Sequence, residues 1–413
     1  MIKSEAIIKD AEIKAKALFS EIECVSLVNQ KKVIDAFRDN KVSSRHFTPS
    51  TGYGYDDISK ITLCQVYASV FKTEKAIVSP IIASGTHALT IALFGLLKPG
   101  DSILSITGNP YDTLMKVING DNIGSLKDYN ISYSSIEYLN NSPDIKIIIK
   151  RLSTEKPTLV FITRSRGYSL RNALSIDEIK DLCKIIKSNS PNSIIFVDNC
   201  YGEFVDKREP CEIGADVVVG SLIKNPGGGI APSGGYIAGK EPFINKISNR
   251  VTAPSLGLEI GSYNATYIPF YQGFFFAPSI VENAMKTNIL AGFAFEMLGY
   301  ETYPKASVMP NDIIRAIKFD NESELIEFIR GVQYSSPVDS YVVPYPWEMP
   351  GYSDKVIMAA GSFIQGGSIE LSADAPIRVP YIAYFQGGLT YQHGKLALLE
   401  SVDRLVTNKT KKI

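Results

Sequence analysis

Short apolar runs alternate with longer stretches of helical spacing over most of this chain. The runs are rich in Val and Ile and lack the polar alternation of a half-exposed strand: AIVSPII, DSILSIT, IKIIIK, TLVFIT, SIIFVD, DVVVG and GGYIAG. Such runs are typical of strands buried in a parallel sheet. Residues 86–97 and 176–188, between them, have helical spacing. The alternation predicts a doubly wound α/β domain with helices on both faces of a mainly parallel sheet.

The two ends of the chain follow a different pattern. Residues 1–45 predict a helix, and an aromatic turn-rich piece, HFTPSTGYGYDD, follows it. Helical periodicity returns near residue 285, and strands are expected near YVVPYP, KVIMAAG and SIELSA. We therefore predict an N-terminal helical segment with a loop over 1–65, a large α/β domain over 66–290, and a smaller α+β domain over 291–413.

Polar residues follow five of the predicted strands. In open α/β sheets, ligands bind beyond the carboxyl ends of the strands. The residues expected there are a hydroxyl and glycine turn, an aromatic ring, arginines, a carboxylate and a lysine: Ser84-Gly85-Thr86, Tyr111, Arg164 with Arg166, Asp198, and Ser221 with Lys224. Together they predict one binding site along this edge of the sheet.

Lys224 and Asp198 carry the most specific chemistry. Lys224 follows VVVGS and precedes NPGGG, which cannot form a regular helix. A desolvated lysine amine loses its proton more easily and can form an imine. Asp198 ends a buried strand, where a carboxylate needs a cationic partner such as a protonated pyridine nitrogen. The plainer alternatives are a surface lysine in a turn and an aspartate that caps the next helix.

Three further features bear on a phosphate-bearing ligand. Ser84, Gly85 and Thr86 open a helix, where free N–H groups and hydroxyls form a phosphate cradle, and Ser221 adds a hydroxyl. Tyr111 is placed to stack on a flat cofactor. An ordinary helix cap and an ordinary tyrosine are the alternatives. The glycines at 227–229 do not form a P-loop, because the lysine precedes them.

Composition narrows the class of protein. Lys+Arg and Asp+Glu both number 43, so no basic excess indicates nucleic acid, and low self-repulsion suits an oligomer. The five cysteines include no CxxC pair and the three histidines are far apart, which argues against a metal site or a disulfide framework. The N-terminus is not a signal peptide, and the apolar stretch 81–97 is broken by glycines. We expect a cytoplasmic protein without a membrane span.

Six stretches resemble a known family: TGYGYDDI, SGTHAL, RSRGYSLR, VDNCYGEF, GSLIKNPGGGIAPSGGYIAG and ELSADAPIRVPYIAYFQGGLTY. The chain resembles the methionine γ-lyase-like group, also called aluminium-resistance proteins, among the fold-type-I pyridoxal 5′-phosphate (PLP) enzymes related to cystathionine β- and γ-lyases. The resemblance covers nearly the whole chain. It implies the PLP-dependent transferase-like fold, with a seven-stranded large domain and a smaller C-terminal domain.

The resemblance also implies roles for individual residues. Lys224 would form the Schiff base, Asp198 would pair with the pyridine nitrogen, and Tyr111 would stack on the ring. Gly85, Thr86 and Ser221 would hold the phosphate, with Ser84 beside them. Arg378 would bind the substrate carboxylate, since its planar fork grips a carboxylate through two hydrogen bonds. Tyr53 and Tyr55 would reach a neighbouring subunit's site, which implies a homodimer or homotetramer with shared active sites.

Two positions depart from the wider relatives. Ile223 stands before the lysine, where a hydroxyl residue is common, and Lys60 is the cation nearest the tyrosine segment, where an arginine is common. The first hypothesis for function is a carbon–sulfur lyase acting on a sulfur amino acid such as cystathionine, cysteine or methionine, with Tyr111 or Tyr53 protonating the departing sulfur. The alternatives are another PLP-dependent reaction, such as transamination, and a stress-related binding protein without turnover.

Overall fold

The computed structural model describes residues 3–139, 141–349 and 354–411. One compact unit comprises Asn29–Phe275, and the other comprises Met1–Val28 together with Phe276–Ile413. Two long helices, α1 (Lys3–Asp39) and α8 (Ile268–Met297), contribute residues to both units. In the described part of the chain, no helix combines the length and the apolarity that a bilayer crossing requires.

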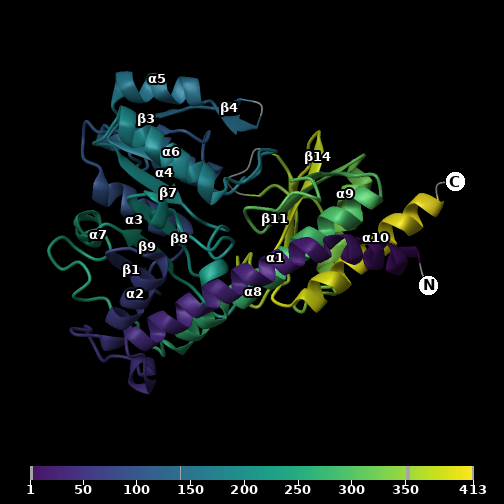
Figure 1. The fold of residues 1–413 in the computed structure, drawn as a ribbon, viewed down its shortest axis with the longest axis horizontal. Helices are drawn as coiled ribbons and strands as arrows, with labels where there is room; N and C mark the ends of the chain where they lie inside the picture. The colour runs from purple at the N-terminus through teal and green to yellow at the C-terminus, as the bar shows by residue number, and fades with distance from the viewer. Residues whose placement is uncertain (1–2, 140, 350–353, 412–413) are drawn as a thin grey trace. The chain divides into compact units, whose positions relative to one another are not determined.

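The Asn29–Phe275 unit is built on a seven-stranded sheet (Figure 1). Its strands, in spatial order, are β1 (Lys75–Ser79), β9 (Gly235–Gly239), β8 (Val217–Ser221), β7 (Ile194–Asp198), β6 (Leu159–Thr163), β2 (Ser102–Ser105) and β3 (Ser132–Ser135). Only β9 runs against its neighbours, so the sheet is mostly parallel, as predicted. Neighbouring side chains on each strand point to opposite faces of the sheet.

Helices cover both faces of this sheet, as predicted. On one face, Phe161 and Phe196 pack in a core cluster with residues of α3 (Gly85–Leu96), α4 (Asp112–Asn119) and α7 (Glu241–Ser248). On the other face, the alternate strand residues Val160 and Ile195 pack with α5 (Ile145–Glu155) and α6 (Ile176–Asn189). Burial on both faces explains why the strands read as continuous apolar runs.

This unit contains further helices and two short strands. They are η1 (Ser44–Phe47), α2 (Ile58–Phe71), η2 (Lys127–Tyr129), β4 (Tyr138–Leu139), β5 (Ser142–Pro143), η3 (Pro210–Ile213) and η4 (Asn225–Gly227). The strand prediction for IKIIIK is wrong, because these residues begin α5. Asp144 caps that helix by accepting a hydrogen bond from the Ile147 N–H at 3.1 Å. Ile148 and Leu152, four residues apart, are its buried stripe.

The second unit has an antiparallel sheet covered by helices. The sheet order is β10 (Glu301–Tyr303), β11 (Ile314–Phe319), β14 (Tyr381–Gln386), β13 (Ser372–Pro376) and β12 (Val356–Ala359). Helices α9 (Glu322–Tyr334) and α10 (Tyr391–Lys411) share its core cluster with residues of α1 and α8. The α+β character of this part is confirmed.

Three strands were predicted in the second unit, with different outcomes. KVIMAAG contains β12, as expected, whereas only the last two residues of SIELSA belong to a strand. YVVPYP forms no strand, and its two prolines cannot donate to a ladder. Its Tyr341 and Tyr345 side chains are exposed.

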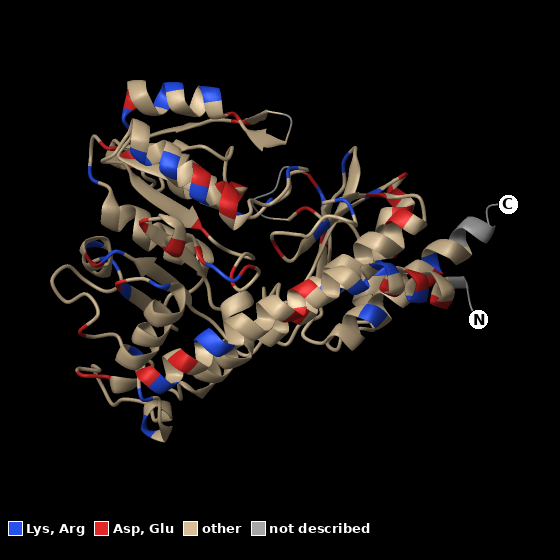
Figure 2. Ribbon diagram, in the orientation of Figure 1, with Lys and Arg blue, Asp and Glu red and all other residues tan. Residues whose placement is uncertain are grey.

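Charged side chains are almost absent from the central strands, whereas α5 and α6 carry both signs (Figure 2). Asp216, directly before β8, is an ion-paired structural acid. Its carboxylate accepts hydrogen bonds from Lys187 Nζ at 2.8 Å, Lys240 Nζ at 2.6 Å and the Ile195 N–H at 2.8 Å. It therefore ties β7, α6 and the start of α7 together at the amino ends of the parallel strands.

The Asp216 carboxylate should make folding dependent on pH. Burial raises its pKa, but the Ile195 N–H and the two lysines outweigh burial and hold the pKa below its ordinary value. The stabilisation is therefore complete above the unfolded pKa of about 3.9 and is lost as the pH falls through the lower folded pKa. We expect Asp216→Asn to lose about 2 kcal/mol of unfolding free energy at pH 7, and less below about pH 4.

Chemical denaturation at pH 7 and at about pH 3 would measure this loss. Asp181→Asn is the matched control, because Asp181 is exposed and pairs with Lys184 on the same helix. That variant should change the unfolding free energy by less than about 1 kcal/mol. Equal losses in the two variants would contradict a structural role for the buried carboxylate.

Candidate active site

The carboxyl ends of β6, β7 and β8 lie side by side. The register pairs Thr163 with Asp198 and Asp198 with Val219, so the residues after these strands meet at one edge. Lys224 follows the end of β8, and its N–H donates to the Ser221 carbonyl at 3.4 Å. The parallel topology thus gathers side chains that are far apart in sequence, as the strand pattern predicted.

Asp198 is a buried carboxylate at this edge. It is 3% exposed, and its Oδ1 accepts a hydrogen bond from the Cys200 N–H at 3.1 Å. Burial raises its pKa, while the Cys200 hydrogen bonds and the positive charge of Lys224 act in the opposite direction. A carboxylate in this environment is stabilised by any further cationic group beside it.

Lys224 lies within electrostatic reach of Asp198. Its ammonium donates a hydrogen bond to the Tyr201 hydroxyl and lies 3.7 Å from the centroid of that ring. Burial disfavours the ammonium, but the attraction of Tyr201, Cys200 and Asp198 outweighs burial and raises the pKa of Lys224. The structure therefore brings together the amine and the acid that the sequence singled out.

The start of α3 closes the site on another side. Ser84 caps the helix by accepting a hydrogen bond from the His87 N–H at 3.1 Å. Gly85 packs so closely that a Cβ there would lie 3.2 Å from the Ser221 Cβ and 3.6 Å from the Cys200 Sγ. The first N–H groups of the helix have no partners within it, so this corner presents donors and the Ser221 hydroxyl to an anion.

Tyr111 lies beside this corner. Its hydroxyl and that of Thr86 form a 2.9 Å hydrogen bond, which links the starts of α3 and α4. Desolvation raises the pKa of the Tyr111 phenol, and the negative charge of Asp198 raises it further, so the phenol stays protonated. Because Tyr111 is still 39% exposed, part of its surface is free to contact a ligand.

The tyrosine segment lies on the surface of its unit. Tyr53 and Tyr55 are 55% and 63% exposed, and their ring centroids are 5.2 Å apart. Nothing within the unit buries these two rings, which is the state expected of side chains that serve another subunit. Their reach into a neighbouring site stays a prediction.

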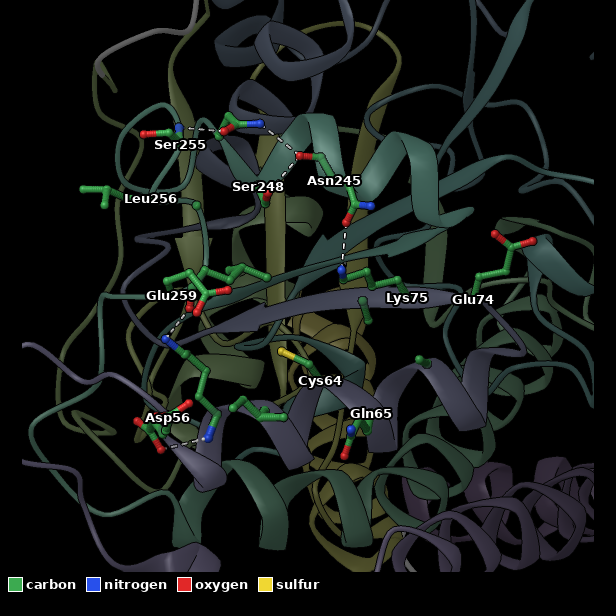
Figure 3. Close-up of a pocket in the computed structure, with 18 residues that line it drawn as sticks. Asp56, Cys64, Gln65, Glu74, Lys75, Asn245, Ser248, Ser255, Leu256 and Glu259 are labelled. Carbon is green, nitrogen blue, oxygen red and sulfur yellow. Dashed lines mark hydrogen bonds between the residues drawn. The ribbon is translucent and has the colours of Figure 1, made fainter.

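Lys60, the cation near that segment, is bound to backbone carbonyls. It is 4% exposed, and its ammonium donates to the carbonyls of Leu258 at 2.7 Å and Ile260 at 2.9 Å. Burial lowers its pKa. Together with Asp56 and Glu259 it lines a cavity of about 520 Å³ (Figure 3). Lys60 therefore fastens the start of α2 to the 258–260 segment.

Arg378 belongs to the second unit. It follows β13, and its guanidinium donates to the Asp354 carboxylate at 2.8 Å. Its side chain is 53% exposed, so the arginine is accessible to an anionic ligand. Its role in binding a substrate carboxylate stays a prediction.

Sequence reasoning missed the residues that hold the loop after β7. Arg164 is buried, and its guanidinium donates to the Asn199 side chain at 2.9 Å and to the Gly202 carbonyl at 2.8 Å. The Asn199 amide donates in turn to the buried Glu209 carboxylate at 2.9 Å. Arg164 was noted at a strand end, but no sequence signal linked it to Glu209.

Tyr201 was also missed as a site residue. It lies within the stretch VDNCYGEF, but its contact with Lys224 depends on a left-handed backbone conformation, φ +72°. A sequence gives no sign of such a conformation in a tyrosine, for which it is unusual.

A mostly parallel sheet whose strand ends gather a lysine, a buried aspartate and a glycine-opened helix defines an α/β protein of PLP fold type I. The fold of the pyridoxal-5′-phosphate-dependent protein YhfS of Escherichia coli matches with a TM-score of 0.64 at 16% identity, over 95% of this chain and 97% of that one. At that identity the likeness shows the fold alone.

The chain belongs to the methionine γ-lyase family, whose family model matches residues 4–406. It is 46% identical to the uncharacterized protein YnbB of Bacillus subtilis, over 98% of this chain and 97% of that protein. A solved structure described as a carbon–sulfur lyase involved in aluminium resistance, from Clostridium novyi, matches with a TM-score of 0.94 at 46% identity, over 98% of this chain and 96% of that one. The family resemblance inferred from the sequence is confirmed.

Arg164 should be required for the stability of this loop. Arg164→Met removes the positive charge that most offsets the burial of the Glu209 carboxylate, so we expect a loss of about 3 kcal/mol of unfolding free energy. Arg208→Met is the matched control, because Arg208 pairs with Asp177 on the surface and should lose less than about 1 kcal/mol. Chemical denaturation would measure both, and similar losses would refute the supporting role of Arg164.

Proposed function

We propose that this protein is a PLP-dependent carbon–sulfur lyase that acts on a sulfur amino acid and yields a thiol, a keto acid and ammonia. The observation that carries the proposal is the placement of Lys224 beside the buried Asp198, next to the corner formed by Gly85 and Ser221. The family match and the description of the Clostridium novyi relative support the same class of reaction.

The donor set fits the proposed cofactor. The corner at Gly85 has backbone N–H donors and a hydroxyl for a phosphate, and a side chain at Gly85 would crowd it. The buried Asp198 suits a protonated ring nitrogen, because an unpaired carboxylate there is costly. Lys224 supplies the amine for a covalent link, and the partly exposed Tyr111 offers a ring for stacking. Ile223 has no hydroxyl to offer the phosphate, and the hydroxyl of Ser221 serves in its place.

When bound, PLP supplies an electron sink for negative charge that develops at the substrate Cα. Lys224 then acts as the base that takes the Cα proton at Nζ. Asp198 keeps the proton on the ring nitrogen. Tyr111 or Tyr53 holds the proton that the departing sulfur needs, and the protonated phenol of Tyr111 suits that task. Arg378 fixes the substrate through its carboxylate.

The proposal includes a homo-oligomer with shared sites. The exposed pair Tyr53 and Tyr55 supports it, because two large rings on a surface loop are typical of a residue pair that contacts another chain.

Lys224→Ala should abolish both the cofactor link and turnover, because no other amine occupies its position. Wild-type protein mixed with PLP should show the visible absorbance of the linked cofactor. After borohydride reduction, peptide mass spectrometry should find the pyridoxyl group on residue 224. Turnover is measured as ammonia and keto acid released from cystathionine, cysteine and methionine without any added amino acceptor.

Lys246→Ala is the control, because Lys246 is an exposed lysine of α7. It should keep wild-type absorbance and turnover. Reduction that places the pyridoxyl group on another lysine would refute the assignment of Lys224. If turnover requires an added keto acid as amino acceptor, the reaction is transamination and not elimination.

Arg378→Leu should weaken substrate binding and leave the cofactor in place. Loss of a charged hydrogen-bonding partner for a carboxylate predicts a rise in KM on the order of 100-fold. Arg330→Leu is the control, since Arg330 pairs with Glu327 on α9, and its KM should stay near the wild-type value. A KM unchanged in Arg378→Leu would show that another residue holds the carboxylate.

A further inference from the structure

Tyr201 contacts the amine on which the proposed chemistry depends. The Lys224 ammonium donates to its hydroxyl, and the same nitrogen lies 3.7 Å from the ring centroid. The lysine is thus held both by the phenol oxygen and by the negative face of the ring, a cation–π contact.

The backbone at Tyr201 adopts an unfavourable conformation. Its φ is +72°, and that of Phe204, three residues later, is +62°. A bulky residue in the left-handed region is sterically strained and persists only where its surroundings impose that conformation. Gly202 lies between them, where a Cβ would come within 2.5 Å of the Arg164 side chain.

Buried groups from four other parts of the unit impose this conformation. Arg164 holds the Gly202 carbonyl, Asn225 donates to the Glu203 carbonyl at 2.9 Å, and Asn29 donates to the Phe204 carbonyl at 3.0 Å. The Glu209 carboxylate accepts from the Phe204 N–H at 2.9 Å. A loop anchored at consecutive residues by buried side chains fixes the Tyr201 ring in one place.

The titratable groups around Lys224 come from several elements. Asp198 at the end of β7, with Cys200 and Tyr201 in the loop that follows, favours its charged form. The phenol of Tyr111 interacts with Asp198 from the start of α4. A second layer lies behind the loop, where Glu203 accepts a hydrogen bond from the Tyr236 hydroxyl of β9 at 2.8 Å, with Arg164 and Glu209 near it.

We propose that Tyr201 is a catalytic residue whose hydroxyl holds and orients Lys224 Nζ in both of its protonation states. The phenol oxygen accepts a hydrogen bond from the ammonium, and it accepts one from an N–H of the neutral amine, which leaves the amine lone pair free to take the Cα proton. The base therefore keeps one direction while it takes and returns a proton. This inference rests on the proposed role of Lys224 as the base.

Tyr201→Phe tests the proposal, since it keeps the ring and removes only the oxygen. A hydrogen bond to a charged group is stronger than one to a neutral group, so the variant should destabilise the ammonium more than the amine. In cofactor-free full-length protein, we expect reductive methylation of Lys224 by formaldehyde and cyanoborohydride at pH 7 to become on the order of tenfold faster. Peptide mass spectrometry over a pH series would measure it.

The loaded enzyme gives a second readout. Tyr201→Phe should lower kcat for the sulfur amino acid at least tenfold and leave KM within about twofold, because the lost contact is with the base and not with the substrate. Tyr129→Phe is the matched control, an exposed tyrosine whose ring packs on Phe94, and it should match the wild type in both measurements. A thermal unfolding curve confirms that each variant is folded.

The outcomes separate this inference from the proposed function. A labelling profile of Lys224 that is the same in Tyr201→Phe and wild type would overturn the role of Tyr201. Borohydride trapping of PLP on residue 224 in the wild type tests the proposed function independently. If trapping succeeds and the profile does not shift, only the inference about Tyr201 fails; if trapping fails, the proposed function fails with it.

Discussion

The burial of the Asp198 carboxylate at the end of β7 is the constraint on which the site depends. A carboxylate removed from water is costly unless positive charge and hydrogen-bond donors compensate for it. Here the compensation comes from the Cys200 N–H and the charge of Lys224, both supplied by loops at the carboxyl ends of strands. These loops must therefore keep a fixed conformation. The buried Arg164 and Glu209 hold the loop after β7 through hydrogen bonds to its backbone.

The two ends of the parallel strands use buried acids differently. Asp216, at the amino end of β8, is bound by two lysines and a backbone N–H, which hold its pKa low. Asp198, at the carboxyl end of β7, has its pKa raised by burial. The first carboxylate is compensated by the fold itself. The second is more weakly compensated and so favours a cationic group supplied by a ligand, which is the property that the proposed cofactor requires.

The sequence predicted the large unit well, because its strands are buried on both faces. Runs such as SIIFVD and DVVVG have no plausible environment other than a covered sheet, and the polar residues after them had to meet at one edge. The same reasoning gave a wrong strand prediction for IKIIIK. An apolar run that follows an Asp cap fits a helix with one buried stripe as well as it fits a strand. Short apolar runs do not distinguish the two by periodicity alone.

The sequence by itself determined the class of fold and singled out Lys224, Asp198, Gly85 and Tyr111, because each lies at the end of an apolar run or within a few residues after it, and the burial of the run dictates where its end lies. Only the tertiary structure decided that Tyr201 contacts Lys224 and that the Lys60 ammonium donates hydrogen bonds to two backbone carbonyls. Both depend on backbone conformation and on partners distant in the chain. A left-handed φ and a carbonyl 198 residues away leave no trace in local residue patterns.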